Sequence, residues 1–264
     1  MFLRAGSCLQ YRVEKKFLGC VSLHILYNDP MNAEKQNFLI PAAIIIAGAL
    51  IAAGIYFGGV NRGSTGPTTD GRPDPLELAK NVAPVSNTDH VQGSAQAQVT
   101  IIEFSDLECP FCKSFHQTMR QVMDEYGADG RVRWVYRHFP LVGLHQKASK
   151  EAEAAECAGE LGGNEVFWKY ITKIFEVTPS NDGLDPAELP KIAAGLGLDK
   201  QKFEACLASG RHAALVEAQA QDAQNAGGTG TPFSVIITAK GEYIPLNGAY
   251  GLPEMKVYLD KALE

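Results

Sequence analysis

Two cysteines separated by two residues, in Cys109-Pro110-Phe111-Cys112, have the types and spacing that thiol chemistry needs. In the first turn of a helix, residues three apart are neighbours, so the two sulfur atoms could close a small disulfide ring. Cys109 would be the N-cap and Pro110 the first helical residue, where the missing proline N–H costs nothing. Unpaired N–H groups and the helix dipole would then stabilise a thiolate on Cys109. We therefore predict a redox site in which Cys109 attacks and the more shielded Cys112 resolves, with Pro110 and Phe111 tuning the pair.

Two other interpretations of this C-x-x-C motif remain open: half of a zinc site, or an inert structural disulfide. Zinc would need two more ligands, and only His116 is close by in the sequence. No second C-x-x-C accompanies the first. We expect redox chemistry that requires no metal and no organic cofactor.

The composition excludes several classes of protein. The chain has 264 residues, 45% hydrophobic and 20% charged, with 26 glycines and 14 prolines, which is ordinary for a globular protein and excludes collagen-like or wholly disordered chains. Its net charge of -6 argues against nucleic acid as a partner, which would need a basic face. The length allows one large domain or two small ones.

An uncharged apolar run over residues 38–60 predicts a transmembrane helix, because a bilayer core needs about 20 apolar residues in a helix. The run is too long for the apolar core of a cleaved signal peptide, and Tyr56-Phe57 stands where small residues should be. We expect an uncleaved signal-anchor; a cleaved signal peptide and a buried core helix are the alternatives.

The segment before the anchor, residues 1–37, is harder to interpret. Residues 1–30 show no clear period, whereas Met31 opens a short polar stretch directly before the apolar run. We therefore expect translation to begin at Met31, which the intact mass of the natural protein would test.

After the anchor we expect a Gly/Pro-rich tether at residues 61–82 and a working domain at residues 83–264. The Lys and Arg residues around the anchor do not favour an outside C-terminus, but long domains translocate largely regardless of charge. The expected redox chemistry places the domain on the extracytoplasmic face of the cell membrane.

The pattern of the domain predicts a β-α-β unit, then helices, then β-β-α. The β-branched run at 99–104 is typical of a buried strand, and the C-x-x-C opens a helix that ends at Gly127. The further elements are a strand at 131–138, helices over about 145–225 including one starting at Asp185-Pro186, a hairpin of 234–238 and 243–246 around Lys240-Gly241, and a last helix from Gly251.

Four segments of the chain resemble the DsbA-like thiol–disulfide oxidoreductases of the thioredoxin superfamily. They are DHVQGSAQAQVTIIEFSDLECPFCKSFH from Asp89, VYRHFPL at 135–141, HQKASKEAEAAECA at 145–158 and GTGTPFSVI at 228–236. The resemblance covers roughly residues 83–264, in the family's order. It implies an α/β thioredoxin fold with a helical insertion between the second strand and the cis-proline strand, here preceded by one transmembrane helix.

The resemblance also assigns Thr231 and Pro232. Sequence alone favours an ordinary trans proline in a turn after a Gly-rich loop. The family, however, places a cis-proline beside the active-site disulfide, where the preceding backbone pairs with substrate. We therefore predict that Thr231-Pro232 is cis and binds substrate.

Glu103 is the third candidate, because a carboxylate in the middle of an apolar strand is costly unless it is paired. The family has an acidic residue here that assists proton transfer to the buried thiol; a structural pair with a residue such as Arg137 is the alternative. We expect Glu108 to be a solvated charge at the rim of the site. We expect His116 and His138 to be ordinary surface or rim residues rather than catalysts.

Cys157 and Cys206 remain on two predicted amphipathic helices of the insertion. Leftover cysteines of an exported domain tend to pair, so we predict a structural disulfide; two separate buried thiols are the alternative. Closing a loop of about 50 residues would contribute roughly 4 kcal/mol.

The implied reaction is dithiol–disulfide exchange with exported cysteine-containing clients, in the direction of oxidation, isomerisation or reduction. A membrane redox partner would reset the active-site pair. The family's strongest oxidases carry His where this chain has Phe111, and Thr231 also departs from them, so we expect a milder oxidant. A dedicated reductase for cytochrome or copper-site maturation, or a redox-inactive client-binding module, are the alternatives. A single anchor with an exported domain of this family suggests a bacterial source.

Overall fold

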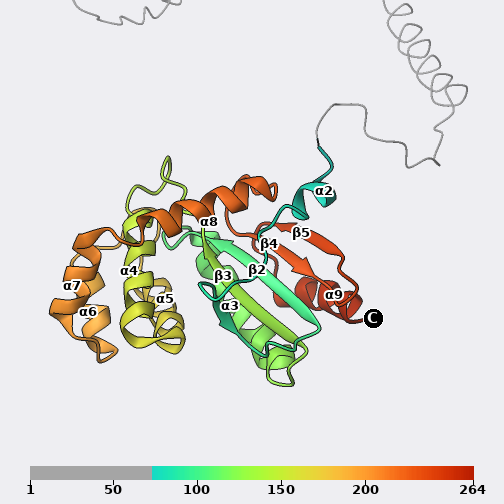
Figure 1. Ribbon diagram of the computed structural model, residues 1–264, viewed down its shortest axis with the longest axis horizontal. Helices are drawn as coiled ribbons and strands as arrows, with labels where there is room; N and C mark the ends of the chain where they lie inside the picture. Colours follow the sequence, from blue (N-terminus) through green and yellow to red (C-terminus); the bar gives the residue numbers. More distant parts are fainter. Residues whose placement is uncertain (1–72) are drawn as a thin grey trace, which may run out of the picture. The chain divides into compact units, whose positions relative to one another are not determined.

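The structure is a computed structural model that describes residues 73–264 (Figure 1). The expectations for residues 1–37, for the anchor at 38–60 and for most of the tether lie outside the described residues. Within residues 73–264, no helix is both long and apolar enough to cross a membrane.

A five-stranded mixed sheet forms the centre of the domain, in the order β1-β3-β2-β4-β5. Its strands are β1 (His90–Gln92), β2 (Val99–Ser105), β3 (Val132–His138), β4 (Phe233–Ile237) and β5 (Tyr243–Asn247). The central pair, β2 and β3, is parallel, and every other pair is antiparallel. This confirms the predicted order of elements, and β1 is an edge strand that the sequence pattern did not predict.

Strand β2 is buried along its whole length, as its β-branched composition predicts. Successive side chains of a strand point to opposite faces, so β2 contributes to two separate cores. Val99 and Ile101 pack with the helices α3 (Pro110–Val122) and α9 (Leu252–Leu263). Ile102 and Phe104 pack on the other face with α8 (Ala213–Asn225). By this alternation Glu103 belongs to the face that α3 covers.

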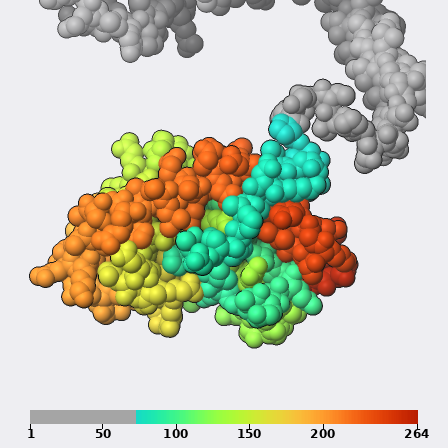
Figure 2. Space-filling view, viewed as in Figure 1, coloured from blue at the N-terminus to red at the C-terminus, as the bar shows by residue number. Residues whose placement is uncertain are grey.

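The helical insertion lies between β3 and β4, as expected. It comprises α4 (Ala148–Gly162), α5 (Asn164–Val177), α6 (Glu188–Gly195), α7 (Lys200–Ser209) and α8. Helices α4 to α7 pack together beside the sheet, and α8 returns the chain along it (Figure 1). In the space-filling view, the orange atoms of the insertion lie at one end of the visible face, and the red atoms of α9 lie at the other end (Figure 2).

Two boundaries and the form of one helix end differ from the sequence-based expectation. Residues 75–82, assigned above to the tether, contain helix α2 (Pro75–Ala79) and the buried side chains of Ala79 and Val82. These two side chains pack on the α8 side of the sheet, so the folded part begins before residue 83. The helix expected from Asp185-Pro186 begins at Glu188 instead. After Val122 the α3 helix widens into a π-helical turn, Met123–Gly127, which still ends at the predicted glycine.

Candidate active site

The C-x-x-C motif lies where β2 gives way to α3, with the helix starting as predicted. Cys109 is the N-cap, with extended backbone angles (φ -79, ψ 123), and Pro110 opens the first turn. Both cysteines are free thiols. Cys109 keeps 4% of its surface exposed and Cys112 none, so the two sulfurs differ in access as expected for an attacking and a resolving thiol.

The two thiols have opposite electrostatics. A hydrogen bond from the Cys112 thiol is the main cause that lowers the pKa of Cys109 to about 6, and backbone N–H groups of the first turn add to it against the opposing effect of burial. Burial raises the pKa of Cys112 well above its usual value, and its contact with Cys109 raises it further. The backbone N–H of Asp106 donates to the Cys112 sulfur at 3.4 Å. Cys109 is therefore the thiolate of the pair near neutral pH.

Thr231 and Pro232 meet the active site from a distant part of the chain. The Thr231-Pro232 peptide bond is cis, as predicted. The Cys109 sulfur lies 3.5 Å from the carbonyl oxygen of Thr231, to which it donates a hydrogen bond when it is protonated. The backbone just before β4 thus lies directly against the attacking sulfur.

Glu103 is fully buried on the α3 face of β2. Its Oε2 accepts a hydrogen bond from Nε1 of Trp134 at 2.9 Å, whereas its Oε1 has no partner among the described residues. Burial raises the pKa of Glu103 to about 7, although the bond from Trp134 opposes the shift. A carboxyl group with this pKa can hold or release a proton near neutral pH.

Tyr136 is the partner of Glu103 in the register of β2 and β3, and its hydroxyl has no hydrogen-bond partner among the described residues. Burial raises the pKa of its hydroxyl well above the usual value, and the charges of Glu103 and Cys112 raise it further. Glu103, Tyr136 and Cys112 therefore share one buried environment under α3. Sequence analysis missed Tyr136, although Tyr136 and Trp134 are two residues apart on β3 and therefore point to the same face of the sheet.

The structural alternative considered for Glu103, a pair with Arg137, is wrong. Arg137 points to the opposite face of β3, where its guanidinium binds Asp89 and Asp222, each at 2.7 Å.

Glu108 is not the solvated rim charge that the sequence suggested, because the insertion folds over it. It is fully buried. Its carboxylate accepts hydrogen bonds from Thr178 Oγ1 at 3.1 Å and from the backbone N–H groups of Gly183 at 3.1 Å and Leu184 at 3.0 Å. Glu108 therefore ties the loop after α5 to the residue next to Cys109.

That loop has an uncommon backbone. Ser180, Asn181 and Asp182 are three consecutive residues in the left-handed region, with φ of 68, 55 and 62. The Asn181 N–H donates to the Glu108 carbonyl oxygen at 2.8 Å, and Asp182 accepts from the backbone of Gln146 at 2.9 Å. These bonds hold the loop against the active-site turn.

Asp106 and His145 form a second contact with the active-site turn that sequence analysis did not single out. The buried Asp106 carboxylate accepts from the N–H of Glu108 at 2.8 Å, from the N–H of Leu141 at 2.7 Å and from Nδ1 of His145 at 2.9 Å. Burial lowers the pKa of His145, but the pair with Asp106 outweighs it and, with the nearby Cys109 charge, raises the pKa overall. The sequence held one clue to this pair, because His145 opens one of the four segments that resemble the DsbA-like family.

The two histidines expected at the surface or rim lie in the core instead. His116 contacts Thr172 Oγ1 at 2.9 Å, and burial, with help from Arg120, lowers its pKa to about 3. His138 contacts Glu156 at 3.1 Å. Each ring has one partner on an insertion helix, which the sequence pattern could not place against it, while the Nδ1 atoms of both have no hydrogen-bond partner among the described residues.

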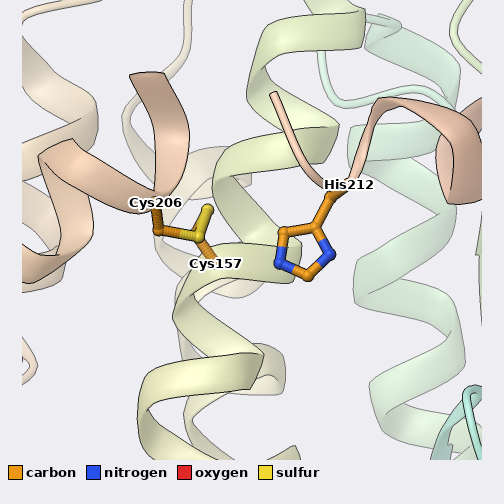
Figure 3. Close-up of side chains that lie close together, drawn as sticks. All are labelled: Cys157, Cys206 and His212. Carbon is orange, nitrogen blue, oxygen red and sulfur yellow. A yellow bond between two sulfur atoms is a disulfide. The ribbon is translucent and has the colours of Figure 1, made fainter. Parts of the chain in front are cut away.

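The second cysteine pair is a disulfide, as predicted. Cys157 of α4 and Cys206 of α7 are bonded across a sequence separation of 49 residues (Figure 3). Both are buried, and the bond joins α4 to α7 within the insertion.

The family model described as Thioredoxin matches residues 85–244. Among curated proteins, the chain is 37% identical over 147 residues to "Na(+)/H(+) antiporter NhaA 3" of Salinispora tropica, covering 55% of this chain and 21% of that protein. It is 31% identical over 158 residues to "Na(+)/H(+) antiporter NhaA" of Herminiimonas arsenicoxydans, covering 60% and 23%. The chain thus spans about a fifth of the length of these curated relatives.

Among solved structures, Pseudomonas aeruginosa DsbA2 matches with a TM-score of 0.55 and 30% identity, covering 68% of this chain and 95% of that one. Wolbachia pipientis alpha-DsbA1 matches at 0.60 with 23% identity, covering 70% and 96%. Oxidised BdbD of Bacillus subtilis matches at 0.60 with 22% identity, covering 68% and 95%. The last two identities are low enough to speak for the fold alone. From the family match, the shared fold and the dithiol at the start of α3, the chain belongs to the thioredoxin family and is DsbA-like.

Proposed function

We propose that this protein is a membrane-anchored, extracytoplasmic oxidoreductase that forms, isomerises or reduces disulfides in exported proteins. The observation that carries the proposal is the pairing of a low-pKa Cys109 with a deeply buried, high-pKa Cys112 at the start of α3. The two pKa values assign the roles, because the better leaving group is the thiol with the lower pKa.

In the oxidising direction, a client thiolate attacks the Cys109 sulfur of the Cys109–Cys112 disulfide. The bond between the two enzyme sulfurs breaks, and Cys112 leaves as a thiolate that takes up one proton. A second client thiolate then attacks the client sulfur of the mixed disulfide, and Cys109 leaves as a thiolate. Two electrons pass from the client to the enzyme pair, and the reverse sequence reduces a client disulfide.

Glu103 serves as the proton store for Cys112 in this mechanism. Its pKa of about 7 lets it be protonated or charged at neutral pH, and it shares the buried environment of Tyr136 and Cys112. Thr231 and Pro232 hold the client, because the Thr231 carbonyl already contacts the Cys109 sulfur. Phe111, 65% exposed, offers an apolar contact beside the reacting atoms.

For the direction of the reaction we propose a milder oxidant than DsbA itself. The side chain of Phe111 has no hydrogen-bond donor to offer a thiolate, and the pKa of Cys109 of about 6 lies above the value of about 3.5 known for DsbA. A less stabilised thiolate makes the reduced form less favoured and the disulfide a weaker oxidant.

The proposed location rests on two features of the chain. The apolar run at 38–60 would anchor it, and the Cys157–Cys206 disulfide suits an oxidising compartment. The partners would be cysteine-containing exported proteins and a membrane redox protein that resets the Cys109–Cys112 pair.

Insulin reduction and refolding of reduced ribonuclease by the purified full chain would test the activity. We expect both assays to be accelerated, the Cys109→Ala variant to fall to the uncatalysed rate, and Cys112→Ser to accumulate a mixed disulfide with the client. The proposal is wrong if the Cys109→Ala variant, folded by circular dichroism, is as active as the unmodified chain.

A further inference from the structure

Four side chains with metal-binding atoms converge around the Cys157–Cys206 disulfide. Cys157 and Glu160 are three residues apart on α4 and so lie on one face of that helix. Cys206 comes from α7, and His212 lies directly before α8 and faces the two sulfurs (Figure 3). Three different segments of the insertion therefore supply one cluster.

The distances within the cluster are short. The two sulfurs and a ring nitrogen of His212 all lie within 4.8 Å of one another. The Oε2 atom of Glu160 is 2.9 Å from Nε2 of His212 and 3.9 Å from the Cys206 sulfur. Two sulfurs, an imidazole nitrogen and a carboxylate oxygen make a four-ligand set that suits Zn²⁺.

We propose that reduction of the Cys157–Cys206 disulfide converts this cluster into a Zn²⁺ site. The reductant is a dithiol, which gives two electrons and two protons to the disulfide and itself becomes a disulfide. The two resulting thiols lose their protons as Zn²⁺ binds both sulfurs. His212 Nε2 and Glu160 Oε2 then exchange their contact with each other for the metal and complete the site.

The surroundings of the cluster fit this exchange. The sulfurs are buried, but the side chains of His212 and Glu160 are 18% and 37% exposed, so a metal ion can enter from their side. Arg211 binds the other oxygen of Glu160 at 2.9 Å, which leaves Oε2 to face the sulfurs. Because the Arg211 guanidinium also binds Glu160, it competes with the metal ion for this carboxylate and limits the affinity of the site for Zn²⁺.

The disulfide and the metal exclude each other, because each sulfur needs to be a thiolate to bind Zn²⁺. Either one links α4 to α7, and only the metal also recruits His212 next to α8. The inference stands independently of the chemistry proposed for Cys109 and Cys112.

Zinc titration of the full chain in detergent would test the site, with Cys8, Cys20, Cys109 and Cys112 replaced by Ser so that only the second pair remains. We expect one equivalent of Zn²⁺ per chain after reduction with a phosphine, none before reduction, and a melting temperature that Zn²⁺ raises in the reduced protein alone. His212→Asn and Glu160→Gln should each weaken binding at least about tenfold, whereas Glu165→Gln on the exposed face of α5 should leave it unchanged.

Three results would overturn the proposal. The reduced protein could stay folded by circular dichroism and bind no zinc. It could unfold on reduction and fail to refold when Zn²⁺ is added. The His212→Asn variant could bind as tightly as its parent, which would show that the sulfurs alone hold the metal.

Discussion

The two cysteine pairs of this domain have the same atoms and nearly the same burial, yet they are built for opposite purposes. Cys109 and Cys112 are neighbours in one helical turn, and the structure has them as thiols. Cys157 and Cys206 are 49 residues apart, and the structure has them bonded. The difference lies in what surrounds each sulfur and in how much chain the bond constrains.

Loop length explains much of the contrast. A bond across about 50 residues removes roughly 4 kcal/mol of freedom from the unfolded chain, whereas a bond across four residues removes only about 2 kcal/mol. The active-site pair therefore stabilises little when it is oxidised, and it can be opened and closed at small cost to the fold. The short spacing also lets one thiol donate to the other, which the insertion pair does not do as a disulfide.

The two cysteine pairs should differ most in their rates of alkylation at pH 6 under non-reducing conditions, measured on protein in which Cys109 and Cys112 are thiols. Cys109 should react about tenfold faster than free cysteine, because its larger thiolate fraction outweighs its lower intrinsic nucleophilicity. Cys157 and Cys206 should not react at all. Peptide mapping by mass spectrometry would measure this, and labelling of Cys157 in folded protein would remove the distinction.

Removing the insertion disulfide should cost stability without touching the exchange chemistry. For Cys157→Ser with Cys206→Ser we expect the free energy of unfolding to fall by about 4 kcal/mol while the alkylation rate of Cys109 stays unchanged. Urea unfolding with and without the substitutions would measure the first value. A parallel drop in Cys109 reactivity would show that the two pairs are coupled.

Glu103 tests how much stability the active-site face gives up by burying a carboxyl group. Its pKa rises from 4.5 to about 7 on folding, so its contribution is most favourable below pH 4.5 and is lost as pH rises toward 7. Glu103→Gln should therefore gain about 3 kcal/mol relative to the parent between pH 4 and pH 8. Urea unfolding at both pH values would measure it, and a gain that does not depend on pH would refute the shift.

The smallest of these effects is expected for His145→Gln, on the alkylation rate of Cys109. His145→Gln keeps a donor for Asp106 but removes a positive charge near Cys109, so the pKa of Cys109 should rise and its alkylation at pH 6 should slow about two- to fivefold. His212→Gln, on the insertion, is the matched control and should not change that rate. An unchanged rate in His145→Gln would leave Asp106 as the only part of that pair that matters to the site.

The sequence predicted the parts of the site that depend on local spacing. The N-cap position of Cys109, the buried strand around Glu103 and the order of elements along the chain followed from short-range patterns and from the resemblance to the family. The cis peptide bond at Pro232 and the Cys157–Cys206 pairing were also confirmed. The local patterns rest on residues a few positions apart and the cysteine pairing on a choice among few partners, whereas the cis bond followed from the resemblance alone.

The environment of Glu108 and of the histidines could not be predicted in the same way. Glu108 looks exposed because it follows Asp106 at the end of a strand, and only the packing of the loop at 178–184 buries it. His116 and His138 are likewise buried by helices that come later in the chain. Burial by a distant insertion leaves no periodic trace in the residues that it covers.

The contact between Glu108 and the left-handed loop after α5 has a consequence for how a client is received. Swinging the insertion away from the sheet would break the three hydrogen bonds that the Glu108 carboxylate accepts from Thr178, Gly183 and Leu184, at a cost of about 1 kcal/mol for each bond. These bonds fasten the insertion to the residue beside Cys109, so movement of the insertion as a hinged jaw on that side costs free energy. A client chain meets a surface that is held in place there, and adapting the client's own conformation is the less costly change.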